Sequence, residues 1–113
     1  MAFVYKILAK PIWDAAIAKG VFAGATIDLT DGFIHLSTAA QAPQTASLFF
    51  KTGDDLLLIG FDDKTLKGLK YEPSRGGDMF PHVYGTIDTT LAVSAVHLQR
   101  QDDGSLRFPD DFQ

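Results

Sequence analysis

The sequence contains no cysteine, which excludes a disulfide framework, a zinc site built on thiolates and a cysteine nucleophile. It also has no excess of basic residues. Ten Lys and Arg stand against 14 Asp and Glu, the formal net charge is −4, and the basic residues form no cluster. Because a nucleic-acid binder needs a basic face to neutralise phosphates, we do not expect general binding to DNA or RNA.

Long hydrophobic runs are missing as well. Residues 1–10 are mainly apolar, but Lys6 and Lys10 interrupt them, so the segment is too short to span a membrane and lacks the core of a signal peptide. We therefore expect a cytoplasmic protein that has no membrane-spanning segment.

The composition that is present is typical of a globular protein. Of the 113 residues, 46% are hydrophobic and 21% are charged, and nine are phenylalanine. A chain of this size can bury a core without a metal or a disulfide. We expect one domain over residues 1–113.

Two element signals stand at the start of the chain. Residues 3–9 alternate in the way of a largely buried strand. Pro11 then opens a helix that Gly20 ends, because proline fits the first helical turn and glycine adopts the left-handed conformation after the last one. Trp13 lies on the apolar stripe of this helix and is expected in the core.

A second helix is predicted further along the first half. Asp31-Gly32 predicts a tight turn and residues 33–36 a short strand. Residues 38–41, Thr-Ala-Ala-Gln, match a capping box, which predicts a helix beginning there and continuing toward Phe50. Pro43 is placed where it would break that helix in two.

The second half of the chain is richer in strands. The apolar run 56–61 is typical of a central strand buried on both faces, and alternation predicts further strands at 69–72, 91–99 and 106–108. Residues 73–78 are turn formers and predict an exposed, mobile loop. We expect an α+β fold with a mixed, mainly antiparallel, split sheet and two main helices in the first half.

The first candidate site surrounds His35. Period-two geometry places His35 and Ser37 on one strand face, just before a predicted helix start at Thr38, where free backbone N–H groups could bind an anion. Imidazole acts as a base, a ligand or a donor near neutral pH. The structural alternative is that Ser37 or Thr38 caps the helix while His35 satisfies a buried polar contact.

The second candidate site combines a loop with the strand that follows it. Arg75 stands beside Gly76 and Gly77, so a guanidinium and closely approaching backbone could hold an anionic group. His82 and Tyr84 then share one strand face. The alternative is a surface loop with two amphipathic side chains packed beside it.

A metal site is a further alternative for the same histidines. His35 and His82, with Asp78 or Glu72, would suit zinc or iron by ligand type. However, no His-x-His or His-Glu-x-x-His spacing supports such a site. We therefore assign no metal ligand.

Two motifs carry a resemblance that covers nearly the whole chain: residues 31–38, DGFIHLST, and residues 72–85, EPSRGGDMFPHVYG, after a Pro-Ile-Trp helix. With them the chain resembles the bacterial family called domain of unknown function 952. That family is similar to the ADP-ribosyltransferase superfamily, which implies a split, strand-rich α+β fold with nicotinamide dinucleotide (NAD) in a cleft.

The resemblance also implies roles for single residues. His35 would hold the cofactor ribose with Ser37 beside it, His82 or Tyr84 would occupy the second catalytic position, and Arg75 would reach the pyrophosphate. The glutamate that usually activates the acceptor has no matched position, and Glu72 is the nearest candidate.

The functional hypothesis that follows is a domain handling a nucleotide or phosphate ligand, of the ADP-ribosyltransferase or phosphotransferase kind. The catalytic candidates are His35, His82 and Tyr84. The ligand-binding candidates are Ser37, Thr38 and the loop Arg75-Gly76-Gly77. One alternative is a non-catalytic module that binds a small anionic metabolite, and another is an interaction domain whose histidines only order the core.

Overall fold

A computed structural model describes residues 2–53, 55–109 and 112. Its helices are α1 (Lys10–Lys19), α2 (Thr26–Asp31) and α3 (Ala42–Phe49), with short 3-10 turns η1 (Asp63–Thr65), η2 (Arg75–Gly77) and η3 (Thr89–Leu91). Its strands are β1 (Phe3–Ala9), β2 (Val21–Phe22), β3 (Ile34–His35), β4 (Ser37–Thr38), β5 (Leu56–Asp62), β6 (Leu69–Pro73), β7 (Met79–Val83), β8 (Ile87–Asp88), β9 (Ala92–Arg100) and β10 (Leu106–Arg107).

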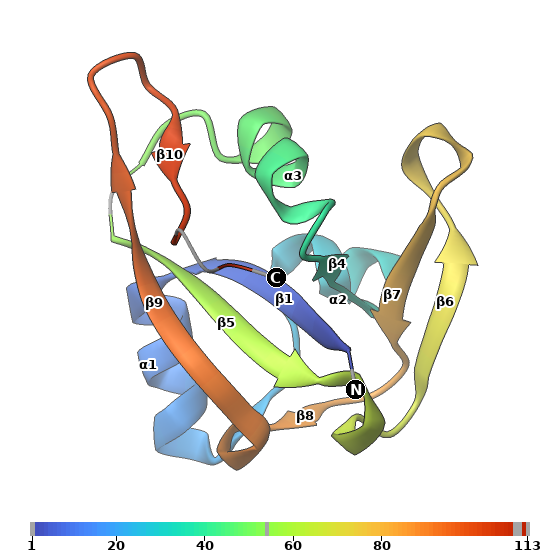
Figure 1. Cartoon of the computed structure of the whole chain (residues 1–113). Coiled ribbons are helices and arrows are strands. Elements are labelled where there is room, and N and C mark those ends of the chain that lie inside the picture. Colours follow the sequence, from blue (N-terminus) through green and yellow to red (C-terminus); the bar gives the residue numbers. More distant parts are fainter. Residues whose placement is uncertain (1, 54, 110–111, 113) are drawn as a thin grey trace.

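The strands form three antiparallel sheets. The largest has the order β10-β9-β5-β1-β4, a second is the pair β2-β8, and the third has the order β3-β7-β6 (Figure 1). Every strand pair in the described residues is antiparallel. The α+β class and the mainly antiparallel pairing are therefore confirmed, and the parallel pairs of the expected mixed sheet are not found among the described residues.

The large sheet is covered on both faces. Along β1, Val4 and Leu8 pack in the same cluster as Trp13 of α1. Tyr5 and Ile7 point the other way and pack with Ala46 of α3. Since β5 lies between β1 and β9 under both clusters, its residues 56–61 are all buried, which explains the uninterrupted apolar run. The predicted central strand is confirmed.

The three-stranded sheet carries the two histidines. In Figure 1 the β6–β7 hairpin stands beside the large sheet, with β7 nearer to that sheet than β6. Strand β3 pairs with β7. The register of β3 against β7 places His35 directly opposite His82. Two residues that are far apart in the sequence thus become a cross-strand pair, whose side chains point to the same face.

The first helix follows its sequence signals. Pro11 lies in its first turn, Trp13 is buried, and Gly20 caps it with a φ of 83°.

The strands predicted at 69–72, 91–99 and 106–108 correspond to β6, β9 and β10 within one or two residues. The loop 73–78 contains the 3-10 turn η2.

The predicted start of the second helix, at Thr38, was wrong. Thr38 and Gln41 do exchange the reciprocal hydrogen bonds of a capping box, at 3.0 and 3.3 Å. These bonds close a turn that precedes α3, and the helix begins only at Ala42. Pro43 therefore lies in the first turn of α3, where its missing N–H costs no hydrogen bond, and it opens the helix instead of breaking it.

The expected tight turn at Asp31-Gly32 is also corrected. Asp31 is the last residue of α2, and Gly32 is its left-handed cap, whose N–H donates to the carbonyl of Asp28. This helix was not predicted, because six residues are too few to show a helical period. No helix in the described part of the chain is long and apolar enough to cross a membrane.

Gly20 provides a test of local strain. A Cβ at this position would meet nothing within 4 Å, so a side chain would be disfavoured only by the φ of 83°. We expect Gly20→Ala to lower the free energy of unfolding by about 1 kcal/mol, the typical cost of a left-handed alanine. Urea unfolding measures it, and an unchanged stability would contradict the assignment of this cap.

Candidate functional site

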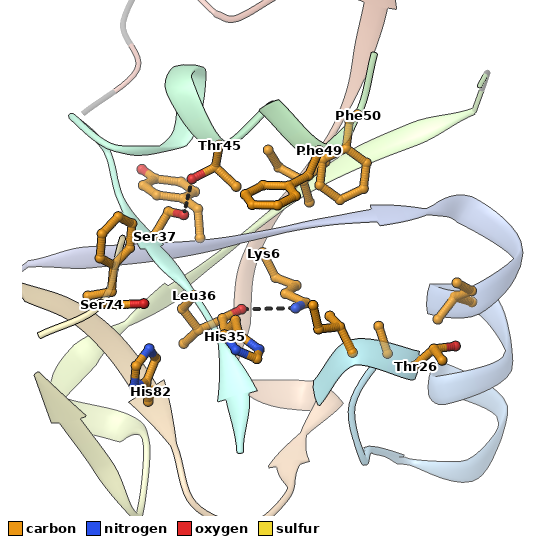
Figure 2. A pocket seen from close by; sticks show the side chains of 16 residues that line it. Lys6, Thr26, His35, Leu36, Ser37, Thr45, Phe49, Phe50, Ser74 and His82 are labelled. Carbon is orange, nitrogen blue, oxygen red and sulfur yellow. Dashed lines mark hydrogen bonds between the residues drawn. The ribbon is translucent and has the colours of Figure 1, made fainter. Parts of the chain in front are cut away.

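A cavity of about 520 Å³ lies along one edge of β1. Strand β4 pairs only with Val4 and Tyr5, although β1 continues to Ala9. Lys6 and Ile7, which follow the paired residues, line the cavity. Lys6 is labelled in Figure 2. We call this cavity the edge pocket. It opens where β4 ends, and residues of α1, α2, α3, β3 and β7 line it.

The mouth of the edge pocket is apolar. Ile12 of α1, Ile27 of α2 and Phe49 of α3 all line it. Their side chains are nevertheless 44%, 56% and 62% exposed. Each helix thus contributes one large hydrophobic side chain that faces both the cavity and the solvent. Ligand pockets in proteins typically combine such apolar walls with a few polar groups.

A buried carboxylate organises the polar wall of the edge pocket. Asp28, which is 2% exposed, accepts hydrogen bonds from Lys6 Nζ at 2.9 and 3.0 Å. It also accepts from the N–H of Ala25 and from both the N–H and Nδ1 of His35. Lys6 Nζ donates in addition to the carbonyl of His35. This cluster joins β1, α2 and β3.

The charges of this cluster compensate one another. Burial by itself would raise the pKa of Asp28, but the Lys6 ammonium and the hydrogen bonds from His35, Lys6 and Ala25 together hold it below 3.8. Burial also lowers the pKa of Lys6, against the attraction of Asp28. The Lys6 charge is therefore matched by a carboxylate within the cluster.

His35 is held on both sides. Its Nδ1 lies 2.7 Å from Asp28 Oδ1, and its Nε2 lies 3.0 Å from Asp31 Oδ2. An ionised carboxylate only accepts hydrogen bonds, so both contacts are satisfied when both ring nitrogens carry hydrogen. In this arrangement His35 fixes α2 against β3, and its ring forms part of the pocket wall.

His82 is held on one side only. Its Nδ1 lies 2.9 Å from Glu72 Oε1, and the same oxygen accepts a hydrogen bond of 2.6 Å from the Tyr84 hydroxyl. The Tyr84 hydrogen bond, followed by that of His82, holds the pKa of Glu72 below its usual value. His82 is 3% exposed, lines the edge pocket, and has no partner for Nε2 among the described residues.

Aromatic packing fixes the histidine pair from the side. Phe33 contacts the rings of His35, His82 and Tyr84, with centroid separations of 4.7, 4.2 and 5.2 Å. The two imidazoles meet edge to face at 5.5 Å. Neither ring can turn without disturbing these contacts.

Three of the predicted site residues line the edge pocket: His35, Ser37 and His82. Ser37 comes from β4, and its hydroxyl lies 3.1 Å from that of Thr45 on α3 (Figure 2). His35 and His82 are 47 residues apart in the sequence, and both line this one cavity. Ser37 of β4 and Thr45 of α3 line it as well.

The other predicted site residues lie elsewhere. Tyr84 is not among the residues that line the edge pocket; it is hydrogen-bonded to Glu72 and packs on Phe33. Thr38 is hydrogen-bonded to Gln41. Gly76 and Gly77 are exposed in η2 and are not among the residues that line the edge pocket. The side chain of Arg75 lies outside the part of the chain that the structure describes.

The buried ion pair between Lys6 and Asp28 was not predicted from the sequence. Lys6 interrupts an apolar strand whose neighbours are buried, a pattern that could have signalled a paired lysine in the interior. Asp28 offered no such signal, because it lies in a helix too short to be recognised. Among the described residues, no group of three His, Asp or Glu side chains is arranged to hold a metal ion.

Comparisons with known proteins agree on the family and on the fold. The family model described as "Protein of unknown function (DUF952)" matches residues 7–97. The crystal structure of protein CC0527 from Caulobacter crescentus is 40% identical, covers 93% of both chains and superposes with a TM-score of 0.89. The solution NMR structure of CC0527 is 42% identical, covers 93% of this chain and 91% of that chain, and gives 0.83. No curated protein matches this chain.

Proposed function

We propose that this chain, which belongs to the DUF952 family, binds a small organic molecule in the edge pocket. The observation that carries the proposal is a cavity of about 520 Å³ with apolar walls from three helices and polar groups along one side. Its volume lies within the range of roughly 300–1,000 Å³ that is usual for small-molecule sites. A ligand with a largely apolar body fits these walls best.

The apolar mouth supports an apolar ligand body. Ile12, Ile27 and Phe49 keep large exposed surfaces beside one cavity, and covering them would remove apolar area from water. Scattered exposed hydrophobic residues are normal on a protein surface. Several of them grouped around one cavity indicate a binding site, because together they offer a larger apolar area to a ligand.

A nucleotide or another phosphate ligand is the second candidate, with NAD implied by the resemblance to ADP-ribosyltransferases. The observation that favours it is the His35–His82 pair, which faces the same cavity. Binding of an anion would need a cation that is free to meet it. The Lys6 charge is compensated by Asp28, so the anion would depend on groups outside this cluster. A small anionic metabolite would likewise need a cationic group outside this cluster.

Three matched pairs of exposed residues allow a sharp test. On each helix, one large exposed hydrophobic residue lines the edge pocket and another exposed one does not: Ile12 and Ile17 on α1, Ile27 and Leu29 on α2, Phe49 and Leu48 on α3. Serine at either member removes exposed apolar surface, but only one member of each pair lines the pocket and can contact a ligand there.

We expect the neutral fluorophore N-phenyl-1-naphthylamine to bind the wild type at a saturable site. Ile27→Ser and Phe49→Ser should each weaken it about tenfold, because each removes roughly 1.5 kcal/mol of apolar contact. Leu29→Ser and Leu48→Ser should leave the affinity within about twofold. Equal losses in both members of a pair, or no saturable binding, would refute the proposal. Competition by NAD or ADP-ribose would favour the nucleotide candidate.

A further inference from the structure

His82 is a buried polar group of the edge pocket that the described part of the chain leaves half satisfied. It is buried and lines the cavity, one ring nitrogen is bound to Glu72, and the other has no hydrogen-bond partner within the described residues. A buried polar atom without a partner is costly and calls for an explanation. The adjacent cavity offers one, since a ligand there could supply the missing partner.

The hydrogen-bond pattern decides which partner would fit. Tyr84 and His82 both donate to Glu72, which keeps that carboxylate ionised and able only to accept. The hydrogen of a neutral His82 therefore lies on Nδ1, and Nε2 presents a lone pair. A charged imidazolium would instead bury an N–H without an acceptor, which costs more than burying a lone pair.

The ring is also locked in direction. Register places His82 on β7 between β3 and β6, Glu72 holds it from β6, and Phe33 packs on it at a centroid distance of 4.2 Å. Because the ring is already fixed, its acceptor nitrogen points in one direction. A bound group therefore gains a hydrogen bond without the entropy cost of immobilising the ring.

From these observations we infer that Nε2 of His82 is a specificity-determining acceptor for a hydroxyl or N–H group of the pocket's ligand. The inference rests on the proposed function, because it needs a ligand in the edge pocket. It narrows the ligand class to molecules with an apolar body and a neutral donor group at this end, such as alcohols, phenols and amides. A phosphate or carboxylate would meet a lone pair there and be disfavoured.

Two probes of nearly equal shape test this inference. 2-Naphthol can donate one hydrogen bond, and 2-methoxynaphthalene cannot. The dissociation constants of both are measured by fluorescence titration with the wild type and with His82→Phe, which keeps a ring in place and removes the acceptor. Tyr84→Phe serves as the control, because it removes a hydrogen bond to Glu72 and leaves Nε2 intact. Thermal unfolding verifies that each variant is folded.

We expect the wild type to prefer 2-naphthol about fivefold, which is the net effect of roughly one hydrogen bond. His82→Phe should remove that preference while both probes still bind, and Tyr84→Phe should retain it. Equal binding of the two probes to the wild type would overturn the inference and leave the proposed function standing. If neither probe binds, the proposed function itself fails.

A measurement on the unmodified protein covers the case in which His82→Phe does not fold. Long-range ¹H–¹⁵N spectra assign the hydrogen of His82 to Nδ1 or Nε2. We expect an unprotonated Nε2 whose ¹⁵N shift moves upfield with 2-naphthol and stays unchanged with 2-methoxynaphthalene. Hydrogen on both nitrogens, or identical responses to the two probes, would contradict the assigned acceptor.

Discussion

Asp28→Ala is expected to lower the free energy of unfolding by about 3–5 kcal/mol, a large part of the stability of a domain of this size. The substitution leaves the Lys6 ammonium buried without its counter-charge. It also removes the acceptor for the N–H groups of Ala25 and His35. Urea or thermal unfolding measures the loss.

Asp31→Ala is the matched control on the same helix. Asp31 also bonds His35, but its side chain is exposed, so its removal should cost no more than about 1 kcal/mol. The double variant Lys6→Met/Asp28→Leu should recover most of the loss, because it removes both charges together. If Asp28→Ala were no worse than Asp31→Ala, the buried cluster would not be the element that holds α2 in place.

The same carboxylate sets a pH dependence. The pKa of Asp28 is lower in the folded protein than its ordinary value of 3.8, because Lys6 and the hydrogen bonds outweigh burial. Its contribution to stability is therefore fully present above about pH 4 and is lost as the pH falls through the folded pKa. Asp28→Asn should flatten the stability curve below pH 4 relative to the wild type. A parallel decline in both proteins would contradict the assignment.

Gly68→Ala is expected to cost about 3 kcal/mol. The φ of Gly68 is 76°, and a Cβ there would lie 2.5 Å from the backbone carbonyl oxygen of Tyr84. About 1 kcal/mol comes from the left-handed conformation and about 1–3 from forcing the backbones apart. The carbonyl of Gly68 also accepts the N–H of Tyr84 at 2.9 Å. Urea unfolding measures the cost.

Gly20→Ala provides the baseline for this prediction, because its φ is similar and a Cβ there meets nothing. The difference between the two variants isolates the close approach of two backbones. Since β6 carries Glu72 and β7 carries His82, the displaced hairpin should also lengthen their hydrogen bond, which the His82 Nδ1–H resonance reports. Equal costs in the two variants would show that the hairpin yields without strain.

Much of the fold followed from local patterns. The strand 56–61 was predictable because a strand covered on both faces needs apolar side chains at every position. Pro11 and Gly20 marked α1 because each residue fits only one end of a helix. The capping box at residues 38–41 formed as predicted, yet the helix began later, because the local bonds of a box can close a turn without continuing it.

The candidate site was only partly predictable. Its histidines stood out by residue type and by their place at the ends of strands. Their pairing needed the register of β3 against β7, which no local pattern encodes. The partners of His35 came from α2, a helix too short to show a period, and the apolar mouth came from three separate helices.

The sequence by itself determined the chemistry that was available: no thiols, no basic face, an α+β pattern of elements, and two histidine motifs that resemble one family. Only the tertiary structure decided how these groups are used. Hydrogen bonds between distant strands and helices gave His35 two carboxylates and His82 one. Beside the cavity, Nε2 of His82 was left with no hydrogen-bond partner in the part of the chain that the structure describes. The hydrogen-bond partners of a buried polar group depend on which residues the fold brings next to it, so the residue types alone do not predict them.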